Sequence, residues 1–116
     1  MIEIGIIPEL DKKKNYASDY SKEMCEYYNC ISIDEDDMEE FMSETYEKKI
    51  PASYCVYGRN VSYGIDACGV TLLSPDSVKM MIDILEKYSD TSWYTKLYAQ
   101  FKKSIAENKY VIVFGV

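Results

Sequence analysis

Apolar residues in the first part of the chain change from a strand period to a helix period. Isoleucine occupies every second position from residue 2 to residue 6, which predicts a strand that ends before Pro8. Apolar and aromatic residues then recur at helical spacing over residues 14–29, and we expect a first helix there. Residues 31–33 are assigned to a short connection.

A second helical pattern follows from about Asp34 to Lys49, and it is strongly acidic. Ser32 or Asp34 can cap this helix, and acids in a first helical turn interact favourably with the positive end of the helix dipole. Pro51 ends the pattern. The predicted buried stripe repeats at i, i+3, i+4 and i+8 and consists of Met38, Phe41, Met42 and Tyr46.

Two runs rich in tyrosine, valine and isoleucine flank Gly58-Arg59-Asn60, a sequence typical of a turn. They predict a β-hairpin at about residues 54–66, with Cys55 across from residue 63 or 64. The apolar positions switch parity beyond Gly69, which predicts either a bulge or a strand that is buried on both sides.

Two more helices and a final strand are predicted in the C-terminal part of the chain. Ser74-Pro75-Asp76 combines a cap, a proline at the first helical position and an acid in the first turn. A second helix start lies at Asp90 or Thr91, and each start leads into a regular apolar stripe. Residues 110–116 are mostly apolar without alternation, which predicts a strand covered on both faces and central in its sheet.

The order of these elements is β-α-α-β-β-α-α-β. It predicts a single α+β domain over residues 1–116, with about four strands in a mainly antiparallel or mixed sheet and the helices packed on it. A chain of 116 residues with 47% hydrophobic residues is long enough for one core. No apolar run could span a membrane, and no basic segment precedes the apolar N-terminus, so we expect a cytoplasmic protein.

Missing residue types narrow the chemistry. The chain has no histidine, which excludes imidazole acid–base catalysis, histidine-activated nucleophiles and histidine-bound metals. Carboxylates, lysine and tyrosine leave a narrow route to an enzyme open, but we predict no catalytic residue, no cofactor and no metal. The cysteines match no zinc-ribbon spacing, and we expect reduced, buried thiols, with metal binding and redox chemistry as alternatives. They are Cys25, Cys30, Cys55 and Cys68.

The formal charge of −7 is concentrated in the first half of the chain. Residues 1–50 carry 14 acidic and 6 basic side chains, whereas residues 51–116 carry 6 acidic and 7 basic ones. Direct binding to nucleic acid or to an anionic membrane is therefore not expected. The stretch IDEDDMEEFM has three readings: a solvated face, a surface for a basic partner, or a cation site at Asp34, Asp36 and Asp37. An EF-hand is excluded, because glutamate stands where that loop needs glycine.

Charge and aromatic content together predict a binding protein. A helix that repeats carboxylates at each turn would be steered onto the basic groove of a nuclease or another nucleic-acid enzyme and would compete with its substrate. Twelve tyrosines are more than one small core can hide, and exposed tyrosines suit a protein interface. The predicted partner-binding residues are Asp34, Asp36, Asp37, Glu39, Glu40, Glu44, Glu47, Tyr27, Tyr57 and Trp93.

In size and charge, this compact, acidic, tyrosine-rich and histidine-free chain resembles small phage-encoded antagonists of bacterial defence, such as anti-CRISPR proteins, and bacterial toxin-immunity proteins. The resemblance implies a non-enzymatic inhibitor. The alternative is a domain, suited to a homodimer, that binds or sequesters a nucleotide or another metabolite in a tyrosine-lined pocket near the hairpin. Arg59, Tyr63 and Asp66 are the candidate ligand-binding residues of that alternative.

Overall fold

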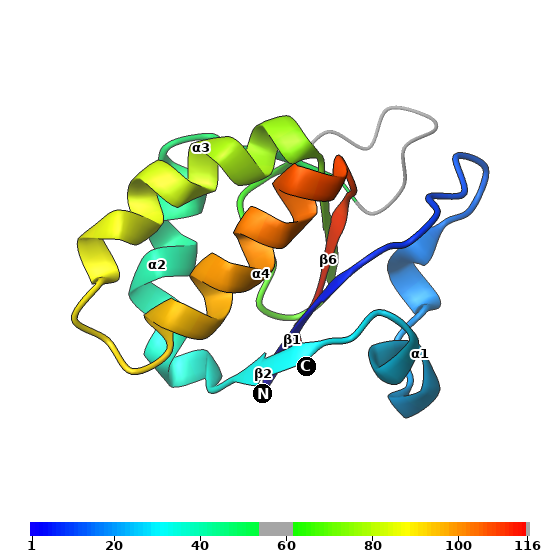
Figure 1. Cartoon of the computed structure of the whole chain (residues 1–116), viewed down its shortest axis with the longest axis horizontal. Helices are drawn as coiled ribbons and strands as arrows, with labels where there is room; N and C mark the ends of the chain where they lie inside the picture. The colour runs from blue at the N-terminus through cyan, green and yellow to red at the C-terminus, as the bar shows by residue number, and fades with distance from the viewer. Residues whose placement is uncertain (54–61, 116) are drawn as a thin grey trace.

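The computed structural model describes residues 1–53 and 62–115. Its strands are β1 (Ile2–Ile6), β2 (Ile31–Ile33), β3 (Pro51–Ala52), β4 (Ser62–Tyr63), β5 (Val70–Leu73) and β6 (Val111–Phe114). Its helices are α1 (Lys22–Tyr27), α2 (Glu35–Glu47), α3 (Pro75–Leu85) and α4 (Tyr94–Glu107), with single 3-10 turns η1 (Tyr16–Ser18) and η2 (Glu86–Tyr88). Figure 1 shows the strands in the middle of the molecule and the two chain ends near each other.

The main sheet has the strand order β2-β1-β6-β5, and all of its neighbours are antiparallel. β6 pairs with β1 on one side and with β5 on the other, so the last strand is interior, as its apolar run predicted. The α+β class and the approximate order of elements are confirmed.

Successive residues of β6 show that both faces of the sheet are covered. Val111 and Val113 belong to a large core on the side of α2, α3 and α4, whereas Ile112 and Phe114 belong to a smaller cluster on the opposite side. All four side chains are fully buried. Because side chains alternate along a strand, a strand between two apolar layers needs apolar residues at every position.

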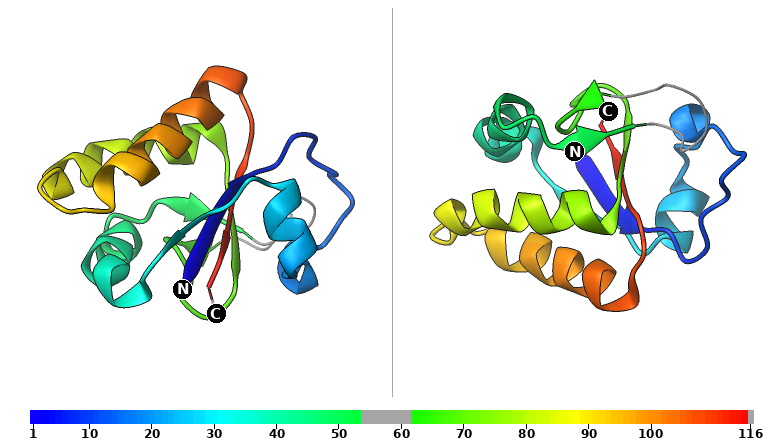
Figure 2. Two further views of the ribbon diagram at one scale, coloured as in Figure 1. Left: turned by 60° about the horizontal axis from the view of Figure 1, so that its bottom comes forward. Right: turned by 90° about the horizontal axis from the view of Figure 1, so that it is seen from above.

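The two covers differ in thickness. Figure 2 shows α2, α3 and α4 on one side of the sheet and α1 with the η1 turn on the other, with α3 and α4 side by side. The smaller cluster is completed by Tyr16 of η1, by Tyr28 at the end of α1, by Ile7 and by Leu72 of β5. The molecule therefore has one thick helical layer and one thin layer built from a short helix and loops.

The single helix predicted over residues 14–29 is wrong. Asn15 caps η1, and its side chain accepts a hydrogen bond from the Ala17 N–H. Ser21 caps α1, and its side chain accepts a hydrogen bond from the Met24 N–H. These two caps start separate short elements, because Ser and Asn side chains compete for backbone N–H groups. Residues 31–33, predicted to be a connection, form the edge strand β2.

The hairpin prediction is only partly tested, because residues 54–61 lie outside the described part of the chain. β3 and β4 pair antiparallel, but Tyr63 lies across from Pro51, so the tighter register that placed Cys55 opposite residue 63 or 64 is wrong. The change of parity after Gly69 marks the start of a new strand. After β4 the chain leaves the two-stranded sheet, and β5 pairs in the main sheet. A bridge between Ser53 and Leu72 connects the two sheets.

Three helices end in the same way. Asn29, Lys49 and Asn108 have φ values of 53°, 54° and 55° after α1, α2 and α4. In each case this residue donates its N–H to the carbonyl three residues before it, and the next residue donates to the carbonyl five residues before itself. This is the Schellman motif, which brings the side chains at the two ends of the longer bond into contact.

Candidate functional site

α2 divides into a buried face and an acidic exposed face. Asp34 caps the helix, with Oδ1 accepting a 2.9 Å bond from the Asp36 N–H. Met38, Phe41 and Met42 are buried against the rest of the core. The exposed carboxylates are those of Asp34, Glu35, Asp36, Asp37, Glu39, Glu40 and Glu47.

Tyr46 was predicted to be buried and is instead 67% exposed. Thr45 takes the buried position, because a spacing of i+7 from Met38 returns closer to the same helix face than i+8 does. Its hydroxyl donates to the Met42 carbonyl at 2.6 Å and accepts a 3.2 Å bond from the Ile65 N–H. The resulting exposed tyrosine lies on the acidic helix itself, which the sequence pattern did not reveal.

Glu44 does not belong to the exposed set. Its carboxylate accepts a 2.8 Å bond from Lys87 Nζ and a 2.7 Å bond from the Tyr88 hydroxyl. These two bonds lower the pKa of Glu44 below its ordinary value. Glu44 therefore joins α2 to the end of the α3–η2 segment. Its predicted role in binding a partner stays a prediction, but its carboxylate is already paired within the chain.

The other predicted carboxylates remain available. Asp34, Asp36, Asp37, Glu39, Glu40 and Glu47 are exposed. The ion pairs within residues 1–53 and 62–115 lie elsewhere, apart from the one at Glu44. These six carboxylates are thus exposed, and none of them forms an ion pair with a lysine of the described residues.

A groove runs beside this acidic face. It has a volume of about 400 Å³ and lies between α2 and residues 65–67. Met42 and Ile65 contribute buried apolar surface, and Tyr46 stands exposed at its side. Its carboxylates are those of Glu39, Glu47 and Asp66. An apolar floor with a carboxylate rim matches a lysine or arginine side chain, which has an apolar stem and a charged head.

The aromatic predictions divide. Trp93 is only 6% exposed and packs against Phe41 and Tyr88 in the core, so its predicted interface role is wrong. It caps the start of α4 and belongs to the large core of the thick layer. Tyr27 is 57% exposed, but it lies on α1, on the other side of the sheet from α2. Tyr57 lies outside the described residues.

The predicted small-ligand trio is not assembled by the described residues. Arg59 lies among residues that the structure does not describe. Tyr63 is exposed, and Asp66 organises its own turn by accepting the Cys68 N–H at 2.9 Å. Asp66 lines the groove beside α2, and Tyr63 is not among the lining residues.

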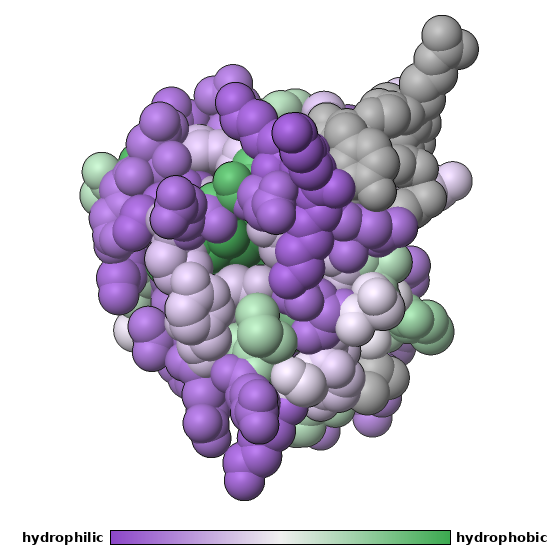
Figure 3. Space-filling view, turned by 90° about the vertical axis from the view of Figure 1, so that its right-hand side faces the viewer, coloured by the Kyte–Doolittle hydropathy of each residue, from purple (hydrophilic) through white to green (hydrophobic). Residues whose placement is uncertain are grey.

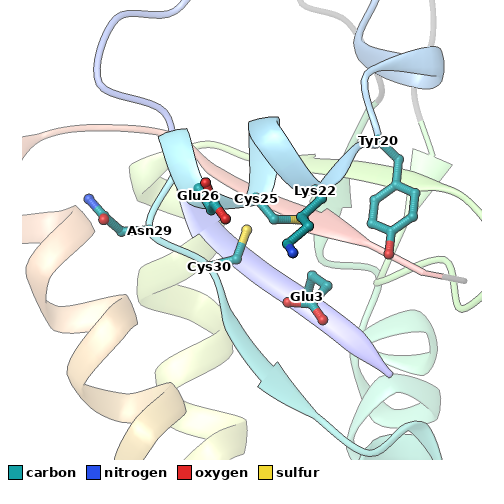
Figure 4. Close-up of a pocket in the computed structure, with 7 residues that line it drawn as sticks. All are labelled: Glu3, Tyr20, Lys22, Cys25, Glu26, Asn29 and Cys30. Atoms are coloured by element: carbon teal, nitrogen blue, oxygen red, sulfur yellow. The ribbon is translucent and has the colours of Figure 1, made fainter.

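A second hollow, which the sequence did not predict, lies beside α1. It has a volume of about 720 Å³ and is lined by Glu3, Tyr20, Lys22, Cys25, Glu26, Asn29 and Cys30. Figure 4 shows Glu3 on β1 facing the same space as the two thiols. Seen from the α1 side, the surface is mostly hydrophilic and is hollowed around a small hydrophobic area (Figure 3). Cys25 and Cys30 are half-buried, but Cys68 is exposed, against the expectation of buried thiols.

A hydrogen bond holds the Glu3 side chain in the wall of this hollow. Ser32 donates to both oxygens of Glu3, at 2.7 and 2.6 Å, which fixes the carboxylate across the β1–β2 pair.

Within the described ranges, no three cysteine or acidic side chains are arranged to hold a metal ion. The same holds for Asp34, Asp36 and Asp37, so a cation site at these three residues is not supported.

Comparison of the chain with protein-family models, with curated proteins and with solved structures gives no match. Among the described helices, none combines the length and the apolar character that crossing a bilayer requires.

Proposed function

We propose that this protein is a non-enzymatic binding module that docks the acidic face of α2 on a basic protein, and that the partner is a nucleic-acid-processing protein. The observation that carries the proposal is the exposed row of carboxylates on α2, free of ion pairs with the described residues and next to an apolar groove. Carboxylates without a partner inside the chain keep their charge available for a partner outside it.

The geometry of α2 supports a partner that recognises repeated negative charge. Asp36, Glu40 and Glu47 lie on one side of the helix, because their spacings of four and seven residues return to nearly the same angle. An α-helix places such side chains roughly every 5.4 Å along its axis. Basic grooves that bind phosphate backbones are built for negative charge at this scale, so the helix and the nucleic acid would compete for them.

The groove adds specificity to this charge. A lysine or arginine of the partner can lay its carbon stem on Met42 and Ile65 while its head reaches Glu39 or Glu47. Tyr46 offers an exposed ring beside it, and tyrosine contributes large contact area at little rotamer cost. Carboxylates, groove and exposed ring together fit a protein surface with projecting basic residues better than a small cation.

The test uses two variants that change the charge by the same amount. Glu39→Lys combined with Glu47→Lys alters α2, and Glu9→Lys combined with Asp83→Lys alters exposed carboxylates elsewhere. Each double variant changes the net charge from −7 to −3. Tagged forms of the protein and both variants are used to capture proteins from a lysate of the organism that encodes the chain. The captured protein is then purified, and its affinity is measured by calorimetry.

The proposal predicts that one basic protein is captured by the parent chain and by the Glu9→Lys/Asp83→Lys control. Glu39→Lys/Glu47→Lys should weaken its binding by about tenfold or more, since close interfacial charge pairs contribute upwards of ~1.5 kcal/mol each. The affinity should fall as salt rises, and the parent chain should displace nucleic acid from the partner. Equal affinity of the two double variants, or simultaneous binding of nucleic acid and the protein, would contradict the proposal.

A further inference from the structure

The end of α1 places two thiols at the two positions that a Schellman motif brings together. Asn29 adopts φ 53°, and its backbone N–H donates to the Glu26 carbonyl at 3.1 Å. The backbone N–H of Cys30 donates to the Cys25 carbonyl at 2.9 Å. The contact between the ends of the longer bond is normally hydrophobic. At the end of α1 it is a pair of cysteines.

The other two Schellman motifs, at the ends of α2 and α4 in the described part of the chain, show that the thiol pair is particular to α1. At the end of α2 the same positions hold Thr45 and Ile50, and at the end of α4 they hold Ser104 and Lys109. The backbone geometry is therefore a general way of ending helices in this protein, while the chemistry at residues 25 and 30 is not required by it.

The turn that joins the two thiols is held by two further bonds. The Ile6 N–H donates to the Tyr28 carbonyl at 3.0 Å, and the Gln100 side chain donates to the Asn29 carbonyl at 3.0 Å. These bonds attach the turn to β1 and to α4. Cys25 and Cys30 are consequently fixed with respect to each other rather than free to separate.

Both thiols face solvent through the hollow beside α1. Cys25 and Cys30 line its wall together with Glu3 (Figure 4). A Cβ at Gly5 would lie 2.7 Å from Cys30 Sγ, so the glycine leaves the space that this sulfur occupies. Each thiol also influences the titration of the other, as two neighbouring sulfurs do.

We propose that Cys25 and Cys30 form a reversible disulfide site that exchanges with a small-molecule disulfide of the glutathione type. Disulfides form when the two Cα atoms are about 4.4–6.8 Å apart, and a direct N–H···O=C bond between the same two residues is compatible with that separation. The proposal is independent of the function assigned to α2.

The exchange balances in two steps. The thiolate of one cysteine attacks oxidised glutathione, which forms a protein–glutathione disulfide and releases one reduced glutathione as thiolate. The second cysteine, as thiolate, then attacks the protein sulfur of this mixed disulfide, which forms the Cys25–Cys30 bond and releases the second reduced glutathione. The protein loses two protons and two electrons, and one oxidised glutathione becomes two reduced ones.

The surroundings of the two thiols determine the rate of thiol–disulfide exchange. Burial, the Glu3 carboxylate and the neighbouring Cys25 raise the pKa of Cys30, and burial, followed by Glu3, raises that of Cys25 despite an opposing contribution from Cys30. Since the thiolate is the attacking species, exchange should be slow at neutral pH. Its rate should rise about tenfold for each unit by which the pH increases, as long as the pH stays below the pKa of the attacking thiol.

The experiment is made in a Cys55→Ser/Cys68→Ser background, so that only the two thiols of interest remain. The folded protein is equilibrated with mixtures of oxidised and reduced glutathione, quenched with acid and analysed by intact mass and peptide mapping. The same mixtures are applied in 6 M guanidinium chloride. Cys25→Ser in the same background is the control that can form only a mixed disulfide.

The proposal predicts a species lighter by two hydrogens, with peptides joined through residues 25 and 30. Its formation constant should be about tenfold or more higher in the folded protein than in denaturant, because the fold holds the thiols together. Cys25→Ser should stop at the glutathione adduct of Cys30. A formation constant that is equal or lower in the folded protein, or glutathione adducts as the end product of the parent background, would overturn it.

Discussion

The two faces of the main sheet are covered in different ways. The thick face carries α2, α3 and α4, and its apolar residues form one continuous core that includes Phe41, Leu97 and Phe101. The thin face carries η1, α1 and the loops around them over a small cluster that includes Tyr16 and Phe114. Polar bonds supplement that cluster, such as the 2.6 Å bond from the Tyr28 hydroxyl to Asp19 and the ion pair of Asp19 with Lys14.

This difference indicates which surface residues are free to take part in binding and which are needed for folding. The free energy of the thick layer comes from apolar burial, so the outer face of α2 contributes little to folding and can carry unpaired carboxylates. On the thin face, by contrast, side chains at the surface also hold the cover in place. We therefore expect substitutions on the outside of α2 to alter association, and substitutions near α1 to alter stability.

Removing one large ring from each core should have the largest effect. Phe101→Ala in the thick layer should lower the free energy of unfolding by about 3–5 kcal/mol, because the packed helices and strands around this ring cannot collapse into the cavity that it leaves. Phe114→Ala on the thin side should cost less, close to the lower end of this range, since loops can collapse into the space. Chemical denaturation of both variants measures the difference. Equal losses, or a larger loss for Phe114→Ala, would refute the distinction between the two layers.

A smaller effect is expected from Tyr28→Phe, which removes the hydroxyl that reaches Asp19. We predict a loss of about 1–2 kcal/mol at pH 7. Burial and the bond to Asp19 raise the pKa of Tyr28 above its ordinary value of 10.0, so its contribution is present below pH 10 and is lost as the pH rises further. The parent chain and the variant should converge in stability above pH 10. A constant difference from pH 7 to pH 11 would contradict this.

The smallest of these effects should come from Glu44→Gln, on the thick side. Its bonds to Lys87 and Tyr88 are near the surface, and we expect a loss of about 1 kcal/mol at pH 7. The pKa of Glu44 is lowered from 4.5, so the contribution is complete above pH 4.5 and disappears as the pH falls through the lower folded value. Thermal unfolding of both proteins between pH 3 and pH 7 tests it. A difference that persists at pH 3 would assign the loss to packing instead.

Much of this architecture follows from local sequence signals. Ser74-Pro75 starts α3, the apolar stripe that runs to Ile105 forms α4, and the unbroken apolar run of β6 gives an interior strand. The short elements were less predictable, because tertiary pairing decides them. Ile31 and Ile33 become a strand only through their bonds to β1.

The candidate site could also be predicted in part, where local sequence signals determine it. The carboxylates of α2 had to be solvated because the stripe beginning at Met38 fixes the buried side of the helix. The pairing of Glu44 with Lys87 joins residues 43 positions apart and leaves no local trace. The thiol pair had a local trace, since a spacing of five residues across a helix end is that of the Schellman contact, but the end of α1 had to be known first.

The central claim is that the outer face of α2, and not the α1 side, is the docking surface. Hydrogen–deuterium exchange of the protein alone and in complex with its captured partner tests this most directly. The account predicts that slowed exchange is concentrated in residues 36–47 and 65–67, with residues 9–13 and 22–30 unchanged. Protection centred on residues 9–13 or 22–30, with α2 exchanging as in the free protein, would contradict it.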